Sequence, residues 1–177
     1  MHYDFGKNHF ELFSLAAAFR IDRERLDSAY REIQSTVHPD KFARLSDAER
    51  RMSMQWATHA NEAYRTLKQP IDRARYLLAL HRVDTQEENN TAMPMDFLME
   101  QMELREAIGE ARAQRNLMAL EKLQTGLKAQ TGMLLERLES QLDVAADYAE
   151  AAQSVRKLRF LEKVSDEIQD AIDIVEE

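Results

Sequence analysis

The chain has 177 residues, of which 44% are hydrophobic, enough for one domain or two small domains with packed cores. Its formal net charge of −8 argues against non-specific binding to nucleic acid, because phosphate contacts need a surplus of lysine and arginine. The absence of cysteine excludes disulfides, thiol catalysis and any thiolate-held metal within this chain. The sequence has no apolar run of about 18 residues for a membrane span and no leader-like opening, so we expect a cytosolic protein.

Few residues interrupt helix formation, since the chain has only 4 glycines and 3 prolines among many alanines, leucines and glutamates. This composition predicts an all-α fold. The first helical segment is short, running from about Asn8 to Leu15. A clearer helix follows, which Asp22 can cap, and its apolar positions are spaced by four and three residues: Leu26, Tyr30, Ile33 and Val37.

An exposed turn separates this helix from the next one. The helix must end near Val37, because Pro39 disfavours helical geometry at His38 and lacks a backbone donor. Ser46 or Asp47 can cap the following helix. The apolar stripe of that helix is Ala48, Met52, Trp56, Ala60 or His59, Ala63 and Leu67. The two helices therefore form an antiparallel hairpin with His38-Pro39-Asp40 at its tip.

A boundary between two domains is predicted by a change in composition. After Pro70, a helix from Ile71 to Leu80 carries Tyr76, Leu77 and Leu78, and the residues from 81 to 93 are mostly polar. We therefore predict an N-terminal domain at 1–80, a linker at 81–93 and a C-terminal domain at 94–177.

The C-terminal domain begins at Pro94, a favoured first helical position, and shows three long helical patterns, at about 94–112, 116–143 and 147–176. The buried side of the second pattern is marked by Leu117, Leu120, Leu127, Leu134, Leu138 and Leu142. The buried side of the third is marked by Leu158, Leu161, Ser165, Ile168, Ile172 and Val175. A three-helix bundle is the simplest way to bury these stripes.

The histidines do not have the spacing of a metal site. The five histidines are scattered, and the only close pairing of histidine with glutamate is His59 with Glu62. A di-iron site in a helical bundle needs two such pairs. We therefore predict no metal and no other cofactor.

The setting of His38-Pro39-Asp40 makes this tripeptide informative. It is followed by Lys41-Phe42 and, one helix later, by Asn61-Glu62-Ala63-Tyr64-Arg65-Thr66-Leu67. In this combination, residues 8 to 80 closely resemble the J domain, whose loop and preceding helix stimulate ATP hydrolysis by DnaK-type chaperones. The resemblance implies these chaperone-binding residues: Arg31, His38, Pro39, Asp40, Lys41 and Arg44.

Two features of the hairpin leave alternatives open. The helix before the loop carries Asp22, Glu24, Asp27 and Glu32 among its arginines, so electrostatic steering would be weaker than in J domains with a strongly basic run. His38 and Asp40 could also be ordinary turn residues or an acid/base pair. For the enzyme alternative, the sequence shows no nucleophile, phosphate-binding glycine loop or second polar cluster.

The first C-terminal helix has two apolar sectors. At about 100° per residue, one sector suffices for packing and contains Phe97, Leu104, Ile108 and Ala111. An adjoining sector, bordered by Glu103 and Glu106, contains Leu98, Met99 and Met102. This second strip could be buried by neighbouring helices or could be a partner surface, for which methionine is well suited.

A second resemblance favours the partner surface. The segment Phe97–Glu106, together with Val155–Leu161, resembles the C-terminal domain of the J-type co-chaperones of iron–sulfur cluster assembly. In that family the C-terminal bundle binds the cluster scaffold protein. The resemblance implies these scaffold-binding residues: Leu98, Met99, Met102, Glu103, Glu106 and Phe160. Phe160 lies one residue off the Leu158/Leu161 stripe, so both an exposed and a core position are open.

These features predict a two-domain, all-helical adaptor that is not itself an enzyme. It would stimulate the ATPase of a DnaK-type (HscA-like) chaperone and deliver an iron–sulfur cluster scaffold protein (IscU-like) to it. Relatives with metal-binding N-terminal cysteines exist, and their absence here favours the bacterial form and the bacterial cytosol. The rival hypotheses are an enzyme that uses His38 and Asp40, and a structural coiled-coil protein.

Overall fold

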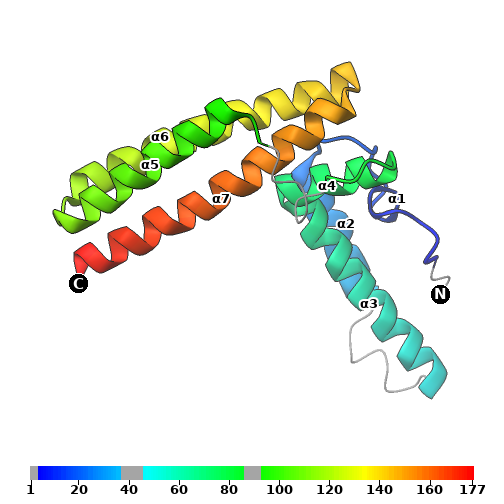
Figure 1. Cartoon of the computed structure of the whole chain (residues 1–177). Coiled ribbons are helices and arrows are strands. Elements are labelled where there is room, and N and C mark those ends of the chain that lie inside the picture. The colour runs from blue at the N-terminus through cyan, green and yellow to red at the C-terminus, as the bar shows by residue number, and fades with distance from the viewer. Residues whose placement is uncertain (1–3, 37–45, 86–92) are drawn as a thin grey trace. The chain divides into compact units, whose positions relative to one another are not determined.

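The computed structural model describes residues 4–36, 46–85 and 93–177. The chain divides into two compact units, Met1–Leu77 and Leu78–Glu177. Within the described ranges the regular structure is helical and contains no strand (Figure 1), which confirms the all-α prediction. Among these residues, no helix combines the length and apolar character that a membrane crossing needs.

The helices of the first unit begin at capping residues. Its elements are α1 (His9–Leu12), α2 (Arg23–Thr36), α3 (Asp47–Lys68) and α4 (Pro70–Leu80), the last of which continues into the second unit. Asn8 caps α1 through a capping box with Glu11, and Ser46 caps α3 through a capping box with Glu49. Of the two capping candidates, Ser46 therefore fills the N-cap position and Asp47 is the first helical residue.

Two tyrosines join α2 to α3, which lie side by side (Figure 1). The rings of Tyr30 and Tyr64 stack with centroids 3.9 Å apart. The Tyr64 hydroxyl donates to Asp27 Oδ1 at 2.8 Å, and the Tyr30 hydroxyl donates to Asn61 Oδ1 at 2.7 Å. These contacts run in both directions between the helices and so fix the register of the predicted hairpin.

The predicted apolar stripe of α3 is wrong at its start. Its buried residues are Ser53, Trp56, Ala60, Ala63 and Leu67. Ala48 and Met52 are exposed. The contacts of Tyr30 with α3 place the end of α2 at Thr36 near the level of Trp56, so the turns before Trp56 have no described part of α2 to pack against.

A buried arginine helps to close the first unit. Arg73 on α4 is only 5% exposed. Its Nε donates to the Phe19 carbonyl at 2.7 Å, its Nη1 donates to the Leu67 carbonyl, and its guanidinium lies 5.0 Å from the Phe19 ring centre. These hydrogen bonds offset the cost of burying the charge, and they tie the segment before α2 to α3 and α4.

The second unit contains a bundle of three long helices, which run alongside one another (Figure 1). They are α5 (Met95–Ala113), α6 (Leu117–Glu139) and α7 (Tyr148–Glu176), with a π-helical segment η2 (Ser140–Ala145) after α6. The predicted pattern of three helices is confirmed, although Pro94 is the N-cap of α5 and not its first helical residue. The core comprises Phe97, Ile108, Ala111, Leu120, Leu127, Leu161, Val164, Ile168, Ala171 and Ile172.

The corner between α6 and α7 is held by specific hydrogen bonds. Gln141 and Ser154 are both buried, and the Ser154 hydroxyl donates to Gln141 Oε1 at 2.8 Å. Ala146 turns the chain with a φ of 51°. Asp147 then caps α7, because its Oδ1 accepts from the Glu150 backbone N–H at 3.1 Å.

The first residues of the second unit contact α7. The His81 ring stacks on Tyr148 with centroids 4.1 Å apart. Arg156 Nη1 donates to the carbonyl of Thr85 at 3.0 Å, and Thr85 is buried. The linker at 81–93 and the domain limits around it stay predictions, since residues 86–92 lie outside the described ranges.

Candidate partner-binding surfaces

The predicted chaperone-binding loop lies outside the described residues, which holds for His38, Pro39, Asp40, Lys41 and Arg44. The structure describes the two helices that flank this loop. Among the predicted chaperone-binding residues only Arg31 is described. It is exposed on α2, and its Nε donates to the Asp27 carbonyl at 3.2 Å.

The α3 segment from Asn61 to Leu67, which contributed to the J-domain resemblance, has a structural role. Asn61 and Tyr64 bond to α2, whereas Ala63 and Leu67 are 0% exposed and pack in the core. Both kinds of contact hold α2 against α3. The segment therefore sets how α2 and α3 lie against each other.

The two sectors predicted for α5 are separated in the structure. Phe97, Ile108 and Ala111 are buried, and Leu104 packs partly buried against the same core, so the packing sector is confirmed. The second strip has a different environment. Met99 is 56% exposed, Met102 is 72% exposed and Leu98 is half-buried. Met99 and Met102 are therefore not part of the bundle core, and the bordering residues Glu103 and Glu106 are exposed.

Phe160 lies at the margin of the bundle core. It is partly buried on α7 and packs against the core cluster. Its ring meets the Phe97 ring edge to face, with centroids 5.7 Å apart and an interplanar angle of 76°. The predicted scaffold-binding residues thus come from both α5 and α7.

Arg105 was missed by the sequence reasoning. Its guanidinium forms two hydrogen bonds with Glu167 on α7, Nε to Oε2 at 2.9 Å and Nη2 to Oε1 at 2.7 Å, and lies 4.8 Å from the Phe160 ring centre. The hydrogen bond to Glu167 raises the pKa of Arg105 further above the physiological range, in which an arginine is always charged. One feature of the sequence could have identified this residue. Arg105 follows Leu98 by seven residues and so shares its side of the helix.

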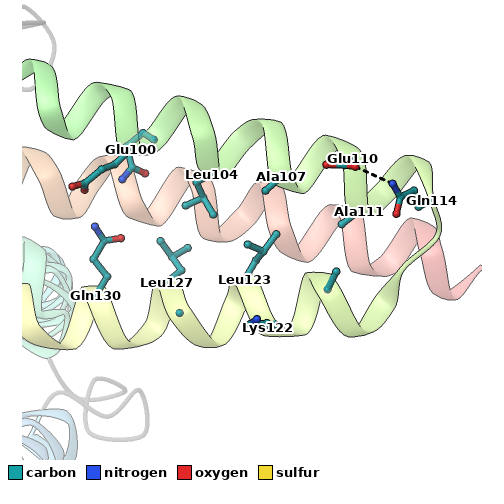
Figure 2. A pocket seen from close by; sticks show the side chains of 13 residues that line it. Glu100, Leu104, Ala107, Glu110, Ala111, Gln114, Lys122, Leu123, Leu127 and Gln130 are labelled. Carbon is teal, nitrogen blue, oxygen red and sulfur yellow. Dashed lines mark hydrogen bonds between the residues drawn. The ribbon is translucent and has the colours of Figure 1, made fainter.

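A hollow of about 670 Å³ lies between α5 and α6. Figure 2 shows Leu104, Ala107 and Ala111 of α5 facing Leu123 and Leu127 of α6 across it. None of the six predicted scaffold-binding residues lines this hollow. The exposed methionine strip and the hollow therefore use different sides of α5.

The chain resembles known proteins over nearly its whole length. The family model of the HSCB C-terminal oligomerisation domain matches residues 93–169. A co-chaperone protein HscB homolog from Burkholderia multivorans is 52% identical over 169 residues, which make up 96% of each chain. The chain belongs to the HscB co-chaperone family. HscB from Vibrio cholerae has a structure that matches with a TM-score of 0.82 and 37% identity, covering 94% of this chain and 98% of that chain. Human HscB matches with a TM-score of 0.87 and 30% identity, covering 94% and 82% of the two chains.

Membership of the HscB family confirms both resemblances drawn from the sequence. The chain is a co-chaperone of the J-protein type that takes part in iron–sulfur cluster assembly, with a J domain followed by a C-terminal helical bundle. The HscB family works through partners, which in general are an Hsp70-type chaperone and a scaffold protein, and does not itself catalyse a reaction. The individual binding residues stay predictions.

Proposed function

We propose that this HscB-family chain stimulates the ATPase of a DnaK-type (HscA-like) chaperone and delivers an IscU-like scaffold protein to it in the bacterial cytosol. The observation that carries the proposal is the exposed strip on α5. Met99 and Met102 are 56% and 72% exposed on a helix whose opposite side already fills the core. Packing of the bundle therefore does not account for these two large apolar side chains.

The composition of the strip fits a protein partner. Leu98, Met99 and Met102 form an apolar centre, and Phe160 adds an aromatic ring from α7. Glu103 and Glu106 are exposed at its edge. An apolar centre with a charged border is typical of protein interfaces, and the acidic border favours a scaffold surface that carries basic residues.

The hairpin of α2 and α3 supports the assignment of the chaperone contact. Its register is fixed by Tyr30, Tyr64 and their hydrogen bonds, so α2 and α3, which flank the His38-Pro39-Asp40 segment in the sequence, are held against each other. Arg31 is exposed on the same hairpin, available to an acidic partner surface. We assign chaperone contact to these four residues together with Lys41 and Arg44.

A single chain that carries both surfaces can hold the chaperone and the scaffold protein at the same time. Two weak contacts that are linked covalently raise each other's effective concentration. The chaperone would hydrolyse ATP and the scaffold would carry the cluster, so this chain needs no reactive group of its own.

The ATPase rate of the purified chaperone, measured with and without the full-length chain, tests this function. We expect wild-type protein to raise the rate and the His38→Gln variant to leave it at the basal value. Thermal unfolding of the same variant serves as the control for folding. ATP turnover by the chain without a chaperone would favour the enzyme alternative, and an unchanged chaperone rate would favour a structural protein.

A further inference from the structure

The scaffold-binding surface is assembled from two helices. Leu98, Met99 and Met102 lie on α5, and Phe160 lies on α7. A partner that contacts both helices at once needs them at a fixed spacing, and it needs the Phe160 ring in a fixed orientation. A partly exposed aromatic ring at the margin of a core is not held by core packing alone.

The Arg105–Glu167 pair bridges these same two helices. Its two parallel hydrogen bonds, at 2.9 and 2.7 Å, join α5 to α7 in the bidentate geometry that arginine and carboxylate favour. Exposed ion pairs of this kind usually add little to folding stability. We therefore interpret the pair by where it lies, between α5 and α7, and not by what it adds to folding stability.

The bridge also holds the Phe160 ring. The guanidinium carbon of Arg105 lies 4.8 Å from the ring centre, and the ring meets Phe97 at 5.7 Å. Glu167 binds both Nε and Nη2 of Arg105, so the plane of the guanidinium is fixed. The Arg105 cation and the Phe97 ring both contact Phe160, and together they restrict the orientation of its ring.

We propose that Arg105 and Glu167 are positioning residues, which orient Phe160 for the scaffold protein before it binds; this inference rests on the proposed function of that surface. An aromatic side chain that is already ordered does not lose rotamer freedom on binding. Ordering one such side chain only at the moment of binding weakens affinity by about three- to tenfold.

A double-mutant cycle on the full-length chain tests the proposal. The affinity for purified IscU-like scaffold protein is measured by isothermal titration calorimetry for wild type, Arg105→Ala, Phe160→Ala and the double variant. We expect Phe160→Ala to lower affinity more than about tenfold and Arg105→Ala to lower it about three- to tenfold. Because Arg105 acts through Phe160, Arg105→Ala should change affinity little in the Phe160→Ala background.

Two further variants separate positioning from charge and from stability. Arg105→Lys keeps the charge but loses the planar fork, and we expect it to weaken binding as Arg105→Ala does. The matched control is Arg137→Ala, since Arg137 on α6 pairs with Glu150 on α7 at 3.3 Å and has no ring contact in the described structure. We expect this control to leave the affinity unchanged, with a melting temperature close to that of the Arg105 variants.

The outcomes separate the inference from the function on which it rests. Full affinity in Arg105→Lys would show that charge alone suffices, and an equal loss from Arg105→Ala in both backgrounds would show direct contact with the partner. Either result overturns the positioning role while leaving the surface in place. Unchanged binding by a folded Phe160→Ala variant would remove Phe160 from the surface and overturn the positioning role, and the surface would then consist of the α5 residues Leu98, Met99 and Met102 alone.

Discussion

The imidazole of His9 is a titratable group packed against other rings in the N-terminal unit. It stacks on Tyr76 with ring centroids 4.0 Å apart, and the His59 ring lies 5.8 Å away. Its Nδ1 is buried and has no hydrogen-bond partner in the described part of the chain. Burial lowers the pKa of His9 from its ordinary value of 6.5, His59 lowers it further, and Glu62 opposes the shift.

This lowered pKa predicts a loss of stability in acid. The unfolded chain takes up a proton at His9 near pH 6.5, whereas the folded chain takes it up only at lower pH. The stabilising effect of neutral His9 is therefore complete above pH 6.5 and is lost as the pH falls from there to the folded pKa. Urea unfolding should show a steeper loss for wild type than for His9→Phe, which keeps a ring against Tyr76. Parallel pH profiles for the two proteins would contradict this role.

Side chains were predictable from the sequence where helical periodicity determines their surroundings. The core positions Phe97 and Ile108 follow from their spacing along one helix, and the same spacing places Met99 and Met102 in a second sector without deciding whether that sector is buried. The roles of Arg105 and Arg73 could not be predicted from helical spacing. Their partners Glu167 and Phe19 are 62 and 54 residues away, so only tertiary packing brings them together.

The limits of the helices were predictable where a capping residue or proline marks them. Ser46 caps α3 and Asp147 caps α7, each through a side-chain hydrogen bond to the backbone. The π-helical segment Ser140–Ala145 was not predictable, because hydrophobic periodicity does not reveal a local change of hydrogen-bond pattern. The exposed start of α3 was missed because periodicity does not reveal where the partner helix ends.

Helix α6 carries a glycine that its surroundings do not require. A Cβ added to Gly126 would meet no atom within 4 Å. We expect Gly126→Ala to stabilise the chain by about 0.5–1 kcal/mol, since glycine is a poor helix former. Thermal unfolding measures this gain, and Leu127→Ala, which removes a buried side chain next to it, should lower the melting temperature instead. A lower melting temperature for Gly126→Ala would show that the open space is needed.

A variant of the exposed strip on α5 tests binding separately from folding. Replacing Leu98, Met99 and Met102 together by alanine removes mainly exposed apolar area, so the melting temperature should hardly change. Affinity for the scaffold protein should fall by well over about tenfold. A control with Met118→Ala and Met133→Ala on α6 removes methionines that are 79% and 65% exposed, and it should leave binding intact. A large loss of stability, or intact binding in a folded triple variant, would remove these residues from the surface.

The whole chain divides into two compact units, Met1–Leu77 and Leu78–Glu177, and its described helices follow the order that the sequence indicates. The J domain and the three-helix bundle were each predictable, because the motifs that indicate them are formed by residues close together in the sequence. The contacts of His81 with Tyr148 and of Thr85 with Arg156 were not, because polar residues after a helix indicate a loop without indicating what it touches.

The proposed function requires one chain to hold both the chaperone and the scaffold protein, and two full-length variants test this requirement. His38→Gln should retain the scaffold surface but not chaperone stimulation. The triple variant of Leu98, Met99 and Met102 should retain chaperone stimulation but not scaffold binding. The measurement is the ATPase rate of the chaperone with scaffold protein, in the presence of wild type or of an equimolar mixture of the two variants. We predict that the mixture reaches only the ATPase rate given by the triple variant alone. The further increase in rate that delivered scaffold protein causes should be absent, because no molecule in the mixture holds both partners. A mixture that restores the full wild-type rate would show that one molecule need not hold both partners, and would contradict the proposed linkage.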